Sequence, residues 1–540
     1  MKGDFDARWH ELAEDVLTGM KEWRLQHPKA TLSEMERALD ERLGRVRARL
    51  LQDLAMASAA ANIKAAQDQE KPVCPKCGTV LESRGQHERQ LMTHHNHALK
   101  LERSYGECPT CGAGFFPLDD ELGLLSGALT PSLQEDATRL GTWMPFERAV
   151  VELQHFRRTD VSRPTVERIT EAAGAAYVKV QEREVEQLER ETPPPPAGPA
   201  KQFLSVDGAY VRLVGGEWAE VKTLAIGEVE PPKQHHGETV IQTHNLSYFS
   251  RQLNVNTFQR WALVETHRRG VETAREVGAV TDGSEWCQTF VDFHRRDALR
   301  ILDFAHAGGY VSQIGQAVFG EGTPTTATWL TDQLHHLKQD GPADMLAEAR
   351  QLAEVHPDLT DLPKHLAYLE KREPQMQYPT FQSAGWPIGD GAVESANKLV
   401  VEARLKGSGM HWAQPHVDPM LALRNIACND RWEEAWSQIT QALRQQAAQH
   451  RAELRQKRKT RCDKLPLILD TTPSREPTHI PPALANVDSP ITPKSLPAPV
   501  TASVPTSKEP YRPAANHPWR HMPIGRARLK SPAKILNAKT

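Results

Sequence analysis

Two short apolar segments of this chain end in the same Asp-Gly dipeptide, and this repetition constrains the fold more than any other feature. Residues 203–211 form an apolar run in which Asp207 precedes a glycine, and residues 278–283 form a second run that ends in Asp282 and a glycine. One such dipeptide is most often a hairpin turn with its carboxylate in water, and this interpretation stays open. Because the pattern occurs twice and a helical segment follows the second run, we expect a sheet with both aspartates at strand ends.

A third carboxylate completes the pattern. Residues 389–398 read Gly-Asp-Gly-Ala-Val-Glu-Ser-Ala-Asn-Lys and place Glu394 near the start of a helical segment. Carboxylates of this kind suit paired Mg²⁺ or Mn²⁺ ions about 3.5–4 Å apart, which support phosphoryl transfer. Asp207, Asp282 and Glu394 are therefore the predicted catalytic and metal-binding residues.

The order of the predicted elements indicates a mixed α/β sheet. Strands are predicted at 201–213, 219–229 and 240–251, a helix at 255–269, and further strands at 277–281 and 298–302. This is the order of an RNase H-like sheet, in which the first and fourth strands are neighbours, so Asp207 and Asp282 are expected to meet at one edge. Roughly ninety mostly helical residues separate the fifth strand from Glu394, which predicts a helical insertion at about 307–385.

Four of the seven cysteines occur in two Cys-x-x-Cys pairs, Cys74 with Cys77 and Cys108 with Cys111. Two matched pairs without a predicted secretion signal favour metal ligation over disulfides. Four thiolates suit a tetrahedral structural Zn²⁺, and the glycine after each pair allows a tight turn. A redox dithiol requires only one pair, and the spacing does not resemble that of iron–sulfur proteins. We therefore predict a zinc ribbon at residues 71–120.

The regions on either side of this ribbon are predicted to be helical. Residues 1–70 carry an amphipathic pattern behind a predicted capping box of Ser33 and Glu36, and their apolar face either dimerises or packs on the next module. Residues 125–190 predict a helix-turn-helix. In that interpretation the second helix directs three side chains at a DNA groove, whereas two packed helices in a linker region are the alternative. The three side chains are those of Arg163, Thr165 and Arg168.

A proline-rich segment at 191–200 predicts a stiff linker before a catalytic domain at 201–440. In that domain Arg404, Lys406 and Trp412 lie in a basic, glycine-containing turn that suits a phosphate and a stacked base, with a buried tryptophan as the alternative. Residues 441–470 predict a helical basic segment. Residues 471–540 hold fourteen prolines, and ten lysine or arginine residues against three acidic ones, which predicts a disordered basic tail.

The chain as a whole has 540 residues, too many for a single core, and a formal net charge of −3. A DNA-binding surface must therefore be local, because the overall charge is not that of a nucleic-acid binder. No apolar run reaches membrane-spanning length and no apolar signal core is present near the start, which predicts a soluble cytoplasmic protein without a membrane partner.

With these features together, the chain resembles bacterial insertion-sequence transposases of the ISKra type, which are distant relatives of the Mutator-like transposases. The resemblance runs from about residue 25 to 440, and residues 517–520, His-Pro-Trp-Arg, look like a further family element. Its most specific motifs are the cysteine ribbon with residues 114–119, and the segments 205–208, 281–286, 301–306 and 391–398.

The resemblance implies a catalytic Asp-Asp-Glu triad on an RNase H-like fold, here Asp207, Asp282 and Glu394. It implies binding to terminal inverted repeats and target DNA, cleavage that depends on Mg²⁺ or Mn²⁺, and strand transfer by the freed 3′-OH. It also implies a dimer or larger homo-oligomer that is nucleoid-associated in a bacterial cytoplasm. By the same analogy Asp303, which competes with Asp282 for the second position, and His306 are supporting residues. An inactive DNA-binding regulator and an RNase H-like nuclease without strand transfer are the alternatives.

Overall fold

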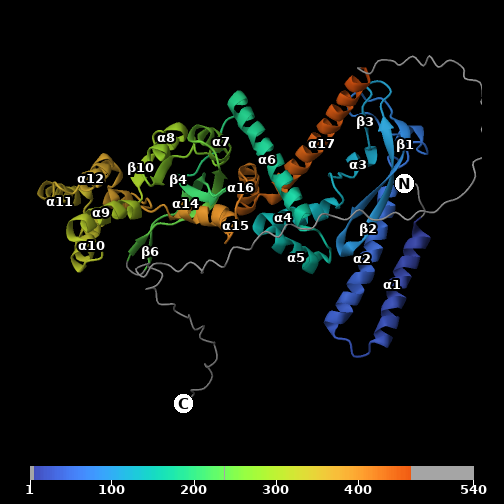
Figure 1. Cartoon of the computed structure of the whole chain (residues 1–540), viewed down its shortest axis with the longest axis horizontal. Coiled ribbons are helices and arrows are strands. Elements are labelled where there is room, and N and C mark those ends of the chain that lie inside the picture. Colours follow the sequence, from blue (N-terminus) through green and yellow to red (C-terminus); the bar gives the residue numbers. More distant parts are fainter. Residues whose placement is uncertain (1–4, 236–237, 464–540) are drawn as a thin grey trace, which may run out of the picture. The chain divides into compact units, whose positions relative to one another are not determined.

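The computed structural model describes residues 5–235 and 238–463, all of which belong to one unit of the chain (Figure 1). The predicted tail at 471–540, with its His-Pro-Trp-Arg element, lies outside the described residues. In the part of the chain that is described, no helix is long and apolar enough to cross a membrane.

The N-terminal region is a pair of helices, α1 (Asp6–Gln26) and α2 (Leu32–Met56), followed by the short η1 (Asp68–Glu70). The predicted helices are correct, but the predicted capping box is wrong. Thr31 is the N-cap of α2: its side chain accepts from the backbone N–H of Glu34, and the Glu34 carboxylate accepts from the backbone N–H of Thr31 at 2.7 Å. Ser33 already lies inside the first turn, so it cannot adopt the extended N-cap conformation.

A three-stranded antiparallel sheet follows, with the order β1-β2-β3. Its strands are β1 (Glu82–Met92), β2 (Ala98–Glu107) and β3 (Gly114–Phe115), with the short η2 (His94–Asn96) between the first two. One Cys-x-x-Cys pair precedes β1 and the other lies between β2 and β3, so the sheet brings the two pairs together. Helix α3 (Pro117–Glu121) closes this region.

The two helices of the predicted helix-turn-helix region are present as α5 (Phe146–Arg157) and α6 (Arg163–Glu191), preceded by α4 (Pro131–Trp143). The two helices begin as predicted, because Pro164 sits in the first turn of α6, where a missing N–H is tolerated. These helices do not form a core of their own. Leu133, Leu153 and Val166 are buried in one cluster with Val211 of the large sheet, so the proline-rich segment does not separate two cores.

The large sheet has five strands in the order β10-β9-β4-β5-β8. Strands β4, β5 and β8 are antiparallel neighbours, whereas β9 and β10 run parallel to β4. The predicted mixed sheet is thus confirmed, with the first and fourth predicted strands side by side. The bounds are β4 (Lys201–Arg212), β5 (Trp218–Val229), β8 (Thr243–Arg251), β9 (Glu276–Thr281) and β10 (Leu299–Leu302). A separate pair, β6 (Lys233–His235) and β7 (Glu238–Val240), precedes β8, which begins three residues after the predicted start of the third strand.

Helices pack on the large sheet around separate apolar clusters. Helices α7 (Val255–Arg268) and α8 (Glu285–His294) bury Phe258 and Phe290 against Leu204 of β4. The predicted insertion is helical, and it packs against Ile301 and Leu302 of β10. Its elements are α9 (Phe304–Phe319), α10 (Pro324–Gln339), α11 (Pro342–Val355), α12 (Leu362–Lys371), η3 (Glu373–Gln375) and α13 (Tyr378–Ser383).

The helices after the insertion contact both the large sheet and α6. A continuous helical segment comprises α14 (Gly391–Ala396), the π-helix η4 (Asn397–Glu402) and α15 (Ala403–Leu405). It contacts β4 and packs on α16 (Gln414–Cys428), which in turn packs on α6. The last described helix is α17 (Trp432–Asp463), which includes the predicted helical segment after residue 440.

Candidate metal centre and acidic site

The four paired cysteines form one cluster. Their sulfurs lie within 4.8 Å of one another, with Sγ of Cys74 3.5 Å from Cys111 and Sγ of Cys77 3.4 Å from Cys108. Cys74 and Cys108 are buried, whereas their partners are exposed. The Thr79 side chain lies 3.4 Å from Cys77, and hydrogen bonding by Thr79 lowers the pKa of that thiol to about 6. Four sulfurs at this spacing fit a tetrahedral zinc ion.

Each cysteine pair lies in a turn that the backbone closes by itself. The N–H of Gly78 donates to the carbonyl of Cys74 at 2.9 Å, and Gly112 donates in the same way to Cys108 at 2.9 Å. Both glycines have positive φ, +73° and +67°, a conformation that side chains with a Cβ rarely adopt. The two turns are therefore matching local structures, and the sheet needs only to bring them together.

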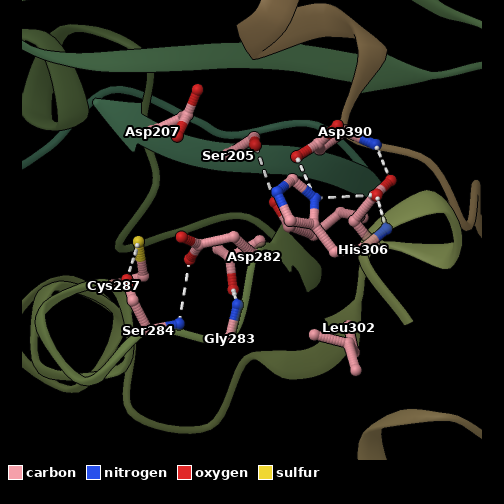
Figure 2. A network of polar contacts seen from close by, with 12 residues as sticks. Ser205, Asp207, Asp282, Gly283, Ser284, Cys287, Leu302, His306 and Asp390 are labelled. Carbon is pink, nitrogen blue, oxygen red and sulfur yellow. Dashed lines mark hydrogen bonds and ion pairs between the residues drawn. The ribbon is translucent and has the colours of Figure 1, made fainter. Parts of the chain in front are cut away.

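Asp207 lies within the central strand β4, where it is partly buried. The predicted strand end is therefore wrong for Asp207, because β4 continues in register with β5 as far as Arg212. The neighbouring strand β9 is tied to β4 by the parallel ladder and by Ser205, whose hydroxyl donates to the carbonyl of Val280 at 2.6 Å. Asp282 follows β9 directly, so both aspartates lie in the same part of the sheet (Figure 2). Burial raises the pKa of Asp207, and the negative charges of Asp282 and Glu394 raise it further.

The turn after β9 holds Asp282 in a defined position. One carboxylate oxygen accepts from the backbone N–H of Ser284 at 2.9 Å, as Figure 2 shows. Gly283 has a φ of +76°, and a Cβ at this position would lie 2.6 Å from Nε of Arg372. The turn therefore requires glycine both for its backbone conformation and for the close approach of the arginine.

Two side chains near the end of α12, in the helical insertion, hold this turn from outside the sheet. Tyr368 donates its hydroxyl to the carbonyl of Asp282, and Nε of Arg372 donates to the carbonyl of Gly283 at 2.8 Å. The Arg372 guanidinium lies 3.7 Å from the centre of the Tyr368 ring, which also stacks on Tyr310 at 3.8 Å. Because Arg372 is buried, its hydrogen bond to the Gly283 carbonyl is shielded from water. We call Tyr368 and Arg372 the brace, because they hold the Asp282 turn in place.

Glu394 lies on α14 with an exposed side chain, one helical turn before Asn397. Asn397 is buried, and its amide nitrogen donates to a carboxylate oxygen of Asp207 at 2.8 Å. The hydrogen bonding of the helix changes to the π type at this residue. Segments of π-helix of this kind are frequent at functional sites. The Asn397 contact thus links the helix of Glu394 to the strand of Asp207.

Asp303 lies nearby but is already fully engaged by its neighbours. It is the N-cap of α9, and one carboxylate oxygen accepts from the backbone N–H of His306 at 2.7 Å and lies 3.0 Å from its Nδ1. The other oxygen accepts from the backbone N–H of Asp390 at 2.9 Å. Asp303 is only 2% exposed, whereas Asp282 is half-buried. Of the two competing aspartates, Asp282 has the carboxylate that is more open to a ligand.

His306 bridges two buried aspartates. Its Nδ1 lies 3.0 Å from Asp303 and 3.8 Å from Asp390, as Figure 2 shows for Asp390. The hydrogen bond with Asp303 raises the pKa of His306 to about 9, and burial raises the pKa of Asp390 to about 7. Although burial alone would raise it, the hydrogen bonds from His306 and the Asp390 amide hold the pKa of Asp303 below its usual value. Asp390, which directly precedes α14, faces this histidine.

The carboxylates of Asp207, Asp282 and Glu394 are the kind of oxygen donor that Mg²⁺ and Mn²⁺ prefer. Among the described residues, two groups of potential ligands lie within 4.8 Å of one another: the four cysteines, and Asp303 with His306 and Asp390. Asp207, Asp282 and Glu394 do not form such a group among the described residues. The pKa of Asp207 is raised, and its carboxylate is repelled by those of Asp282 and Glu394. Both properties fit a site that a bound cation would stabilise.

The predicted DNA-facing residues fall into two groups. In α6, Arg163 and Arg168 are exposed and Thr165 is half-buried, so this helix start is accessible. Arg404 and Trp412 are instead 2% and 7% exposed. They are interior residues because they pack on α4 and α5, a long-range contact that the local composition does not reveal.

The burial of Arg404 and Trp412 corrects the predicted DNA-binding turn. Nε of Arg404 donates to the carbonyl of Gly141 at 2.9 Å, and its guanidinium lies 4.7 Å from the ring centre of Phe146 and 5.1 Å from that of Trp412. Lys406 pairs with Glu402 at 2.6 Å. The alternative interpretation, a buried tryptophan beside a glycine-containing turn, is the one that the structure supports.

Four residues of the site were not identified as functional from the sequence: Asn397, Tyr368, Arg372 and Asp390. Only Asn397 carried a usable signal, because it follows Glu394 at helical spacing within a motif. Searches against models of protein families and against curated proteins find no match for this chain.

Proposed function

We propose that this protein is a DNA transposase that cleaves DNA and transfers strands at Asp207, Asp282 and Glu394. The observation that supports the proposal is that the negative charges of Asp282, in the turn after β9, and of Glu394, on α14, both act on Asp207 of β4 and raise its pKa. The strand order supports an RNase H-like assignment, because the strand with the first aspartate and the strand before the second are parallel neighbours.

In this proposal the carboxylates would hold two divalent cations, Mg²⁺ or Mn²⁺, which would activate the attacking oxygen and stabilise the leaving oxygen. Asp207 is oriented by Asn397, and Asp282 by Ser284 and the brace of Tyr368 and Arg372. Glu394, which is exposed on α14, is the third carboxylate of the set. Water is the nucleophile of the first displacement, and the freed 3′-OH attacks target DNA in the second.

The N-terminal modules give the proposed enzyme its means of finding DNA ends. The exposed start of α6 presents Arg163 and Arg168, which suit contacts to phosphate or base edges of a terminal repeat. An inactive DNA-binding regulator would need these residues but not the acidic site, and the intact carboxylates favour catalysis. A nuclease without strand transfer would need the acidic site, and only a strand-transfer assay separates it from a transposase.

The proposal is tested with a DNA duplex that carries the sequences flanking the gene, incubated with target plasmid and Mg²⁺ or Mn²⁺. We expect the wild type to cut at the end and to join it to target DNA. Asp207→Asn should bind the same duplex with unchanged affinity and cut it at least about a thousandfold more slowly. Loss of binding together with cleavage would indicate a folding defect, cleavage without joining would support the nuclease, and specific end binding without cleavage by the wild type would support the regulator.

A further inference from the structure

Helix α2 carries a row of leucines that no other described element covers. Leu32 is 71% exposed, Leu39 38%, Leu43 47% and Leu54 49%, although all four are large apolar side chains. Exposed leucines scattered singly need no explanation, but a contiguous row on one helix face is typical of an interaction surface.

The row has the spacing of a coiled-coil seam. Residues 32, 36, 39, 43, 47, 50 and 54 follow one another at intervals of three or four and therefore share one face of the helix. Five of these positions are leucine, and the other two are Glu36 and Arg47, both exposed. We call this face the α2 seam.

The other two faces of α2 are already occupied within the chain. One faces α1, where Arg42 donates to the carbonyl of Gly19 at 3.4 Å and Trp9 donates to Asp53 at 3.2 Å. The other packs on the cysteine-bearing sheet, where Ala48 and Ala55 are buried in a cluster with leucines of β1 and β2. Packing on the next module thus uses a different face from the α2 seam.

The α2 seam is complementary to itself when reversed. In an antiparallel pair centred on residue 41, Leu32 lies opposite Leu50 and Leu39 lies opposite Leu43. Glu36 lies opposite Val46, next to Arg47, and Leu54 extends beyond the start of the partner helix. An antiparallel copy of α2 would therefore place leucine against leucine and, twice over, glutamate beside arginine. Arg47 also donates to Thr93 at 2.6 Å, which leaves further N–H groups of its guanidinium for a partner.

From this pattern we propose that the α2 seam is a dimer interface, in which α2 pairs antiparallel with α2 of a second copy of this chain. The proposal does not depend on the function of the acidic site.

Sedimentation velocity of the full-length protein without DNA, over a range of micromolar concentrations, tests the interface. The wild type is expected to be a dimer, and the double variant Leu39→Lys, Leu43→Lys a monomer that keeps its zinc content and helical circular dichroism. The matched control is Leu17→Lys on α1, where the leucine is 68% exposed but lies off the seam, and this variant should remain a dimer.

Charge exchange tests the antiparallel pairing and does not rely on changing a leucine. Glu36→Arg and Arg47→Glu should each weaken self-association about tenfold, because each places like charges together at both ends of the seam. An equal mixture of the two variants should dimerise as well as the wild type, since every pair across the seam is then of opposite charge. A wild-type monomer at all concentrations, a dimer that tolerates the double lysine variant, or a mixture no tighter than its components would each overturn the proposal.

Discussion

The cysteine cluster and the acidic site are both suited to metals, but the chain builds them in different ways. Each cysteine turn is closed by its own backbone hydrogen bond and needs only its partner turn. The acidic site takes Asp207, Asp282 and Glu394 from separate elements, and its geometry depends on side chains from other segments. A local pattern therefore suffices to build the first site, whereas the second exists only when the whole fold is assembled.

Loss of one cysteine should have the largest effect and should stay local. In Cys108→Ser we expect loss of bound zinc and unfolding of residues 71–116, because structural zinc contributes about 10 kcal/mol to small domains of this kind. Zinc content and limited proteolysis measure both effects. Cys428→Ala, a cysteine outside the cluster, should retain full zinc. Full zinc in Cys108→Ser would contradict the four-cysteine site.

Removal of the brace should impair the acidic site without touching a carboxylate. Arg372→Ala is expected to slow DNA cleavage about a hundredfold with unchanged DNA affinity, because the Gly283 carbonyl loses a buried charged donor worth about 2–3 kcal/mol. The neighbouring Lys371→Ala removes only a surface pair with Glu285 and should change cleavage less than about twofold. Equal effects of the two substitutions would show that the insertion does not position Asp282.

The link between Asp207 and the helix of Glu394 should make a smaller contribution. Asn397→Ala removes one donor to the Asp207 carboxylate, and we expect about a tenfold slower cleavage, in line with about 1.4 kcal/mol for a hydrogen bond to a charged group. Ser395→Ala, at an exposed position of the same helix, is the matched control and should leave the rate unchanged. A normal rate for Asn397→Ala would mean that Asp207 is oriented without it.

The smallest effect should be a pH-dependent loss of stability on changing His306. The pKa of His306 in the folded state is raised to about 9, above its unfolded-state value of about 6.5. The folding stability that protonated His306 contributes is therefore fully present below about pH 6.5 and is lost as the pH rises through about 9. We expect His306→Gln to lower the melting temperature at pH 6 and to match the wild type near pH 10. Asp303, Asp390 and Asp282 are the charges that act on this histidine. A difference independent of pH would contradict this account.

Much of the fold could be predicted because its helices and strands follow from local sequence patterns. Apolar runs gave the strands of the large sheet within a few residues, although β4 continues past Asp207 and Gly208 to Arg212. The paired Cys-x-x-Cys spacing gave the cysteine cluster for the same reason. The predicted order of strands then placed Asp207 and Asp282 together, since parallel neighbours present the same end to one edge.

The parts that could not be predicted depend on contacts between distant residues. Arg404 and Trp412 have the composition of a DNA-binding turn, but packing against Phe146 places them in the interior. Nothing in the sequence around Arg372 shows that its guanidinium reaches the Gly283 carbonyl, 89 residues away. The role of Asp303 as a saturated N-cap likewise depends on the amide of Asp390.

Cleavage of an end-bearing duplex by Asp282→Asn and Asp303→Asn, measured side by side with Mg²⁺ or Mn²⁺, tests the central claim most directly. The account predicts that Asp282→Asn binds the duplex but does not cut it, as for Asp207→Asn and Glu394→Gln. Asp303→Asn should still cut, at a reduced rate, because its carboxylate caps α9 and holds His306. Cleavage by Asp282→Asn together with complete loss of cleavage in a folded Asp303→Asn would contradict the assignment of the acidic site.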